Sequence, residues 1–154
     1  MSFKPTPTKT KLETVARALQ LIQKTNSWTK HADLEQSKDS QGKTRSRFCL
    51  RGALRAAVTG DTAMADEVLE GREAKLINGS SVEITRTINR NPERYGLDSD
   101  DHEDGVVSFN DDSRVEHKHV VRALRDTVER LSGGRVAGGY DGSPAGNGYS
   151  LCGD

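Results

Sequence analysis

The chain has 154 residues, of which 32% are hydrophobic, and its mean hydropathy is −0.74. These values suit one modest core with ends that do not pack. The 23 basic residues are balanced by 23 acidic ones, which excludes an overall charge that attracts nucleic acid or an anionic membrane. The sequence has no signal peptide and no apolar run of about 18 residues, and its two cysteines form neither a disulfide framework nor a zinc pattern. We therefore expect a cytoplasmic protein with free thiols and no membrane partner.

The first predicted helix follows residues 1–9, which carry two prolines. Thr10 and Glu13 have the spacing of a capping box, in which each side chain binds the other residue's backbone amide. Up to about Asn26, apolar residues recur on one helical face, namely Leu12, Val15, Ala16, Leu19 and Ile22.

Two more helices are expected in the middle of the chain. The polar run 30–43 shows no period and is interpreted as a loop. Ser46 is the expected cap of a second helix that Gly60 ends, with a stripe of Leu50, Ala53, Leu54 and Ala57. A third helix is expected from Asp61 or Thr62 to Asn78-Gly79.

Two further capping-box patterns divide the second half of the chain. The one at Ser80 predicts a helix over residues 80–90, although the β-branched residues there would also suit a strand. An acidic loop reaches Gly105 and precedes a short extended segment, 106–109. The pattern at Ser113 predicts a final helix that ends near Leu131.

Together these signals predict a mainly α fold, a compact bundle of four to five short helices with one short extended segment. A single domain would cover residues 10–132. Residues 1–9 and the glycine-rich tail 133–154 would be flexible, because they offer too few apolar side chains to offset the entropy of ordering.

Cys49 is a candidate nucleophile. It lies in the predicted second helix near Arg45, Arg47 and Arg51, where the helix dipole and the positive charges would lower the pKa of a thiol. A cysteine-dependent enzyme would need a base, His117 or His119, and a group to orient it, Asp111 or Asn110; His117 with Asp111 is the favoured pair. A small buried hydrophobic residue is the simpler interpretation of Cys49, because free cysteines are among the most buried residue types.

The acidic loop has a partial EF-hand spacing. Positions 1, 3, 5, 6, 8 and 12 would be Asp100, His102, Asp104, Gly105, Val107 and Asp111. His102 at the third position and Asp111 at the twelfth do not suit a calcium site. We favour a solvated loop over residues 98–105 and expect no metal or other cofactor.

The single cluster of basic residues spans residues 43–55 and includes Arg45, Arg47, Arg51 and Arg55. Such a patch could bind phosphate groups of a nucleic acid. It lacks interleaved aromatic residues and a nucleic-acid-binding motif, so a solvated basic face is favoured.

Several short motifs in this order resemble an uncharacterised family of small proteins from actinobacteria and their bacteriophages: Trp28-Thr29, Phe48-Cys49-Leu50-Arg51-Gly52-Ala53-Leu54, Phe109-Asn110-Asp111, and His117 with Val120-Val121. That family usually has Trp at the position of Phe109. The resemblance implies an intracellular accessory protein and transfers no activity. It selects five candidate binding residues, Trp28, Cys49, Asn110, Asp111 and His117.

No complete catalytic motif accompanies these residues. We therefore expect a non-enzymatic interaction or regulatory protein, a bacteriophage accessory protein that acts on a host protein. The cysteine-dependent enzyme and nucleic-acid binding through residues 43–55 remain the alternatives.

Overall fold

The computed structural model describes residues 6–24 and 26–133. Helices dominate these residues, which confirms the mainly α class. In chain order, with η for the short 3-10 helices, the elements are α1 (Lys11–Ile22), β1 (Leu34–Lys38), β2 (Thr44–Phe48), α2 (Leu50–Thr59), η1 (Thr62–Asp66), α3 (Gly71–Arg90), η2 (Pro92–Tyr95), α4 (Val106–Asp111) and α5 (His117–Leu131).

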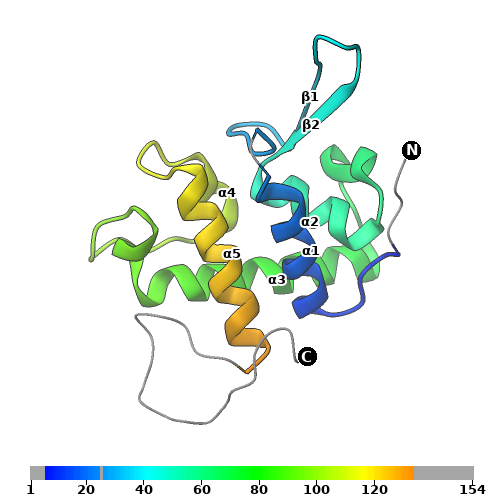
Figure 1. The fold of residues 1–154 in the computed structure, drawn as a ribbon. Coiled ribbons are helices and arrows are strands. Elements are labelled where there is room, and N and C mark those ends of the chain that lie inside the picture. Colours follow the sequence, from blue (N-terminus) through cyan, green and yellow to red (C-terminus); the bar gives the residue numbers. More distant parts are fainter. Residues whose placement is uncertain (1–5, 25, 134–154) are drawn as a thin grey trace.

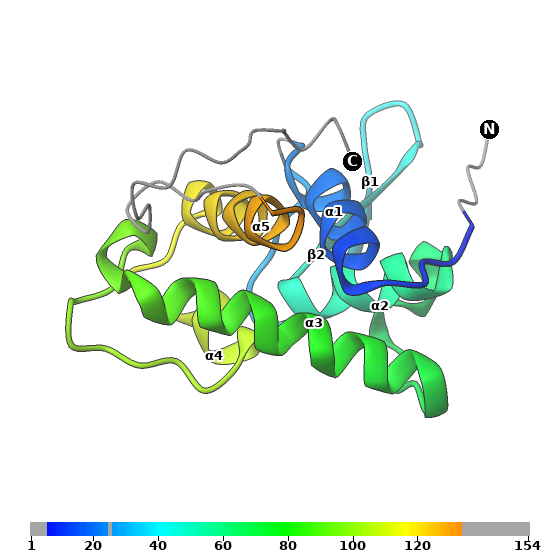
Figure 2. The ribbon, with the colours of Figure 1, turned by 90° about the horizontal axis from the view of Figure 1, so that it is seen from below.

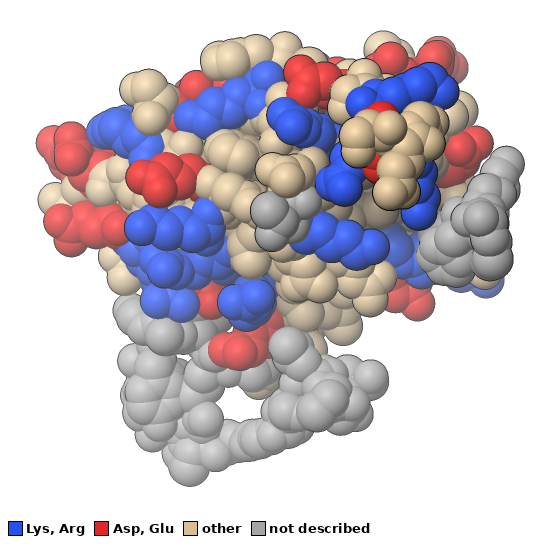
Figure 3. All heavy atoms as spheres, turned by 45° about the horizontal axis from the view of Figure 1, so that its top comes forward, with Lys and Arg blue, Asp and Glu red and all other residues tan. Residues whose placement is uncertain are grey.

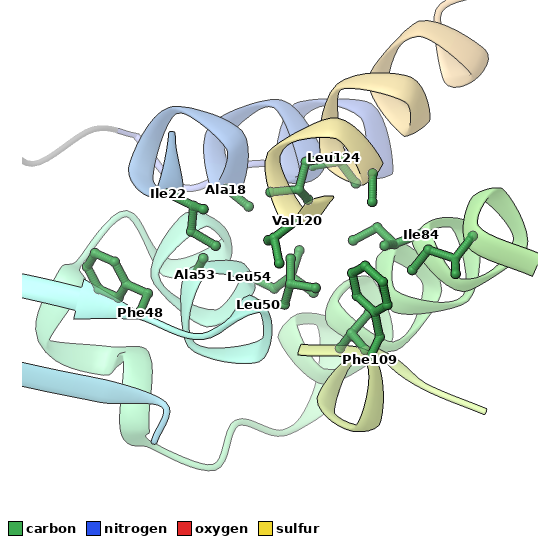
Figure 4. Close-up of a cluster of buried hydrophobic side chains, with 14 of the residues drawn as sticks. Ala18, Ile22, Phe48, Leu50, Ala53, Leu54, Ile84, Phe109, Val120 and Leu124 are labelled. Atoms are coloured by element: carbon green, nitrogen blue, oxygen red, sulfur yellow. The ribbon is translucent and has the colours of Figure 1, made fainter. Parts of the chain in front are cut away.

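The long helices pack in two layers around one core. Helices α1 and α5 lie side by side across α3, and α2 packs against both α1 and α3 (Figure 2). Each contributes apolar side chains to the centre, as Figure 4 shows for Ile22 of α1, Leu54 of α2, Ile84 of α3 and Leu124 of α5. These four side chains are completely buried, and burying each contributes about 1.5–3 kcal/mol.

A β-hairpin of residues 34–48 projects from this helical body (Figure 1). Its strands pair antiparallel, from Leu34 opposite Phe48 to Lys38 opposite Thr44. The turn is specified locally: the Asp39 carboxylate accepts the amides of Gln41 and Lys43 at 2.9 Å each. Gly42 supplies the left-handed backbone there, with φ of 78°.

The interpretation of residues 30–43 as a loop was therefore wrong over β1, residues 34–38, and right over the turn, residues 39–43. The strands were missed because most of their side chains are exposed, so no alternation of apolar and polar residues marks them. Ser46 lies within β2, and α2 is capped instead by Cys49, whose sulfur accepts the amide of Gly52 at 3.4 Å.

Two predicted boundaries around α3 were also wrong. The segment after Asp61 forms η1 rather than the start of a helix, and α3 continues through Asn78-Gly79. Ser80 is buried in the interior of α3 instead of capping it. Burial of Ile77 and Ile84, on either side of Ser80, stabilises a continuous helix, and this stabilisation outweighs the local capping signal. The helix predicted over residues 80–90 is confirmed.

In the C-terminal half, the segment 106–109 forms α4 instead of the predicted extended stretch. The final helix begins after Glu116 rather than at Ser113. The Glu116 amide donates to His119 Nδ1 at 3.0 Å, while Arg114 turns outward to bind Asp112 at 2.8 Å and Asp101 at 2.8 Å.

The capping box at Thr10 is present as predicted, but α1 ends at Ile22 rather than near Asn26. Part of the N-terminal stretch expected to be flexible packs on α1, since Thr8 is 2% exposed and shares a hydrogen bond of 2.7 Å with Thr14. Residues 1–5 and nearly all of the predicted tail lie outside the described residues. Within the described ranges, no helix has the length and apolar character needed to cross a membrane.

Candidate functional site

Asn110, in the last turn of α4, joins three segments that are distant in sequence. Its side chain is completely buried. Oδ1 accepts the indole N–H of Trp28 at 2.7 Å and the backbone amide of Leu50 at 3.0 Å. Nδ2 donates to the carbonyl oxygen of Thr29 at 3.1 Å. One amide side chain thereby fixes the chain before the hairpin to the start of α2.

Asp111, the next residue, holds the following turn of the same loop. Its Oδ1 accepts the backbone amide of His31 at 2.8 Å, and Oδ2 lies 3.5 Å from His31 Nδ1. His31 has φ of 66°, in the left-handed backbone region that residues other than glycine rarely adopt. The carboxylate holds this strained backbone in place.

His117, at the start of α5, supports Trp28 from the other side. The imidazole stacks on the indole with centroids 5.7 Å apart and planes 7° from parallel. Nε2 lies 2.7 Å from the carbonyl oxygen of Ile22. Because a carbonyl only accepts, Nε2 carries the hydrogen. We call Trp28, Asn110, Asp111 and His117 the clamp.

Asp33 forms a second connection between the hairpin base and α2. Its carboxylate accepts from Arg51 Nε and Nη2 at 2.9 Å each and from Arg55 Nη1 at 3.0 Å. Burial alone would raise the pKa of Asp33, but the hydrogen bonds from Arg51 and Cys49 and the charges of Arg51 and Arg55 lower it below its usual value. Asp33 is therefore a carboxylate at neutral pH.

Gly52 permits this contact. A Cβ atom at position 52 would lie 1.8 Å from the carbonyl oxygen of Asp33, which is impossible without movement of one backbone. The glycine costs α2 about 1 kcal/mol relative to alanine, and it allows the loop before the hairpin to lie directly on the helix.

A model of a family of unknown function, DUF6197, matches residues 6–130. The chain belongs to this family. No curated protein and no solved structure matches it. The resemblance to a family without an assigned function is thus confirmed, and its actinobacterial or bacteriophage origin stays a prediction.

In this member of DUF6197, four of the five candidate residues meet in the clamp, and the fifth faces elsewhere. Cys49 adjoins the clamp through the backbone of Leu50, but its thiol is buried and donates to Asp33 Oδ1 at 3.2 Å. Burial, and then the adjacent Asp33 carboxylate, raise the pKa of Cys49 to about 12. The shift is opposite to the one expected from the helix dipole and arginines, so the structure supplies no thiolate for the cysteine-dependent alternative.

The four arginines of the predicted basic patch are each placed opposite a carboxylate. Arg51 and Arg55 bind Asp33, Arg47 lies 3.4 Å from Glu35, and Arg45 lies 3.8 Å from Asp39. Basic and acidic side chains are interspersed over the face seen in Figure 3. Exposed pairs such as Arg47 with Glu35 contribute little to stability, but they leave no uniform positive surface for a phosphate backbone.

The acidic loop does not assemble the EF-hand positions. Asp111, the expected twelfth ligand, belongs to the clamp and binds His31. The carboxylates of Asp98, Asp100 and Asp101 do gather within 4.8 Å of one another. Arg114 Nη1 lies 3.4 Å from Asp98 and 2.8 Å from Asp101, so this cation already compensates part of their charge.

Sequence reasoning missed Asp33 and His31 because both lie in a stretch without periodicity. The clamp fixes the base of the hairpin to α2, α4 and α5, and Asp33 fixes it to α2. The hairpin itself, residues 34–48, is the element that these contacts present to solvent, and it is the candidate functional site.

Proposed function

We propose that this DUF6197 protein is a non-enzymatic interaction protein that binds a partner protein through the outer edge of β1. The observation that carries the proposal is a rigidly mounted hairpin with a free strand edge. Such an edge pairs with an extended segment of another chain, because its backbone groups point outward without partners.

The strand register identifies those backbone groups. The amide of Phe48 donates to the carbonyl oxygen of Ser27 at 2.9 Å, and the carbonyl oxygen of Phe48 accepts the amide of Thr29 at 3.1 Å. Both backbone groups of Phe48 therefore point away from β1. Residue pairs alternate along an antiparallel ladder between mutually bonded and outward-facing pairs. Counting from Leu34 opposite Phe48, the backbone groups of Gln36 and Lys38 also face outward. Within the described residues, β1 has only β2 as a strand neighbour.

The contacts that attach the base of the hairpin to the helices support this use of the hairpin. A two-stranded hairpin alone is marginally stable in water. Here its base is fixed on both sides, by Asp33 at the start of β1 and by the bridge between Trp28 and Phe48 at the end of β2. A fixed edge loses less conformational entropy on binding than a flexible one does.

The experiment is an affinity purification with the full chain and with two variants of Gln36. Gln36→Pro removes the outward-facing N–H but no bond of the β1–β2 ladder, and proline is tolerated on edge strands. Gln36→Thr keeps the N–H and serves as the matched control. We expect a partner recovered in stoichiometric amount by the wild type and Gln36→Thr and lost with Gln36→Pro.

Two results would contradict the proposal. One is the absence of any stoichiometric partner. The other is a partner that Gln36→Pro retains while circular dichroism and the urea midpoint match those of the wild type. Retention on DNA or RNA that falls steeply with salt would instead favour nucleic-acid binding through the residues 43–55.

The proposal includes the setting implied by the family resemblance. The protein would act in the cytoplasm, as an accessory protein of actinobacteria or their bacteriophages, on a protein of the host cell. The net charge of zero and the absence of a complete catalytic motif support an interaction role over an enzymatic one.

A further inference from the structure

A cleft of about 350 Å³ opens between α1 and the end of α2. Arg17, Gln20 and Leu21 line it from one face of α1, and Gln23 and Lys24 line it just beyond the C-terminal end of that helix. The opposite wall includes Ala56 and Gly60 of α2 and its cap. The hollow is bounded on that side by these two small residues. Its volume is at the lower end of the range of about 300–1,000 Å³ that is usual for small-molecule sites.

The charged residues of the cleft have one sign. Arg17 lies on α1 and Lys24 lies two residues past the end of that helix, and no acidic side chain lines the cleft within the described residues. Lys24 makes no side-chain hydrogen bond or ion pair to another described residue, and Arg17 donates through Nη1 to the carbonyl oxygen of Thr6 at 3.3 Å. Both cations are available to a ligand.

Neighbouring negative groups offset part of these two charges. The carboxylate of Asp61 caps η1 by accepting the amide of Ala63 at 3.0 Å. The C-terminal ends of α1 and α2 lie near the cleft, and each carries roughly half a negative charge. The last carbonyl of α1 is compensated, since the Ile22 oxygen accepts from Ser27 Oγ at 2.7 Å and lies 2.7 Å from His117 Nε2.

We propose that this cleft binds a small organic anion with an apolar body. The apolar part would lie on Leu21 and Ala56, where burial of apolar surface provides affinity. The anionic group would lie at the rim beside Lys24 or Arg17, and the amide of Gln20 can donate to it. This inference is independent of the hairpin, which lies at the other end of α2.

The test is an NMR titration of the ¹⁵N-labelled full chain with 2-naphthoate, and with 2-naphthamide as its uncharged counterpart. We expect the largest amide shifts at Leu21, Lys24, Ala56 and Gly60. Lys24→Gln should weaken binding of 2-naphthoate by about fivefold, the size of one partly exposed ion pair. Lys75→Gln, which removes an exposed lysine of α3 outside the cleft, should leave it unchanged.

Arg17 is a poor site for a second test, because its replacement would also break its hydrogen bond to Thr6. The second variant is therefore made at Gln20. Gln20→Glu places a negative charge in the cleft and should weaken 2-naphthoate but not 2-naphthamide. Equal affinities for the two probes, shifts centred on another surface, no shifts at millimolar probe, or insensitivity to both Lys24→Gln and Gln20→Glu would each overturn the proposal.

Discussion

The indole nitrogen of Trp28 lies 2.7 Å from the side-chain oxygen of Asn110, although 82 positions separate them. The same oxygen accepts the amide of Leu50, so one buried amide group connects the segment before the hairpin, the start of α2 and the end of α4. These contacts give residues selected by the family resemblance a structural role and leave the hairpin as the part that is presented to solvent.

Replacing Asn110 should destabilise the protein strongly. Asn110→Ala leaves the buried N–H groups of Trp28 and Leu50 without an acceptor, and each such loss costs about 1–3 kcal/mol. We expect the free energy of unfolding to fall by about 3 kcal/mol or more, measured by urea titration of the fluorescence of Trp28, the single tryptophan. Asn78→Ala, at an exposed site on α3, should change it little. Similar midpoints for both variants would contradict the clamp.

Two glycines in helices should respond in opposite ways to alanine. Gly52→Ala places a methyl group against the backbone of Asp33 and should cost about 1–3 kcal/mol, as overpacking does. Gly79→Ala places it 3.0 Å from Cε of Lys11, the far part of a flexible side chain that can move. It should therefore stabilise α3 by up to about 1 kcal/mol. Thermal unfolding of the two variants measures the difference in sign.

The fall in the free energy of unfolding at low pH should depend on Asp112. Hydrogen bonds from Arg114 lower the pKa of Asp112 to about 2. Because this value lies below that of the unfolded chain, the ionised side chain stabilises the fold above about pH 4, and this contribution is lost as the pH falls toward 2. Asp112→Asn should thus be less stable than the wild type at pH 7 and approach it near pH 2. Asp104→Asn, at a side chain 96% exposed, should show no such convergence.

The thiol of Cys49 should be unreactive in the folded protein. In a Cys152→Ser background, Cys49 is the only remaining thiol. Its burial and a pKa near 12 leave almost no accessible thiolate at pH 8. We expect labelling by a disulfide reagent only after unfolding in urea. Rapid labelling of the native protein would restore the cysteine-dependent enzyme as a leading hypothesis.

Local chemistry made the start of α1 predictable, because the two partners of its capping box are three residues apart. The same kind of signal failed at Ser80, where burial of Ile77 and Ile84 on the body of the protein kept α3 continuous. The hairpin carried no signal, because a strand exposed on both faces has no apolar alternation. Sequence periodicity therefore predicted the helical class but not the element that we assign to function.

The candidate site, too, could be predicted from the sequence only in part. The family resemblance selected Trp28, Asn110, Asp111 and His117, yet only the tertiary structure shows that they meet. Nothing in the local sequence marks Asp33, whose importance arises from Arg51 and Arg55 more than 15 residues away. The direction of the Cys49 pKa could not be predicted either, because burial and a facing carboxylate outweigh the nearby positive charges.

The distance in sequence between the parts of the clamp also sets an order of assembly. The turn of the hairpin depends only on Asp39 and its close neighbours, so it can form while the chain is being synthesised. The contacts that hold the base of the hairpin cannot form until Asn110 and His117 have left the ribosome, because these two residues are the partners of Trp28. Long-range contacts of this kind slow folding. The nascent chain therefore exposes Trp28 and the two strands until residues 110–117 have emerged.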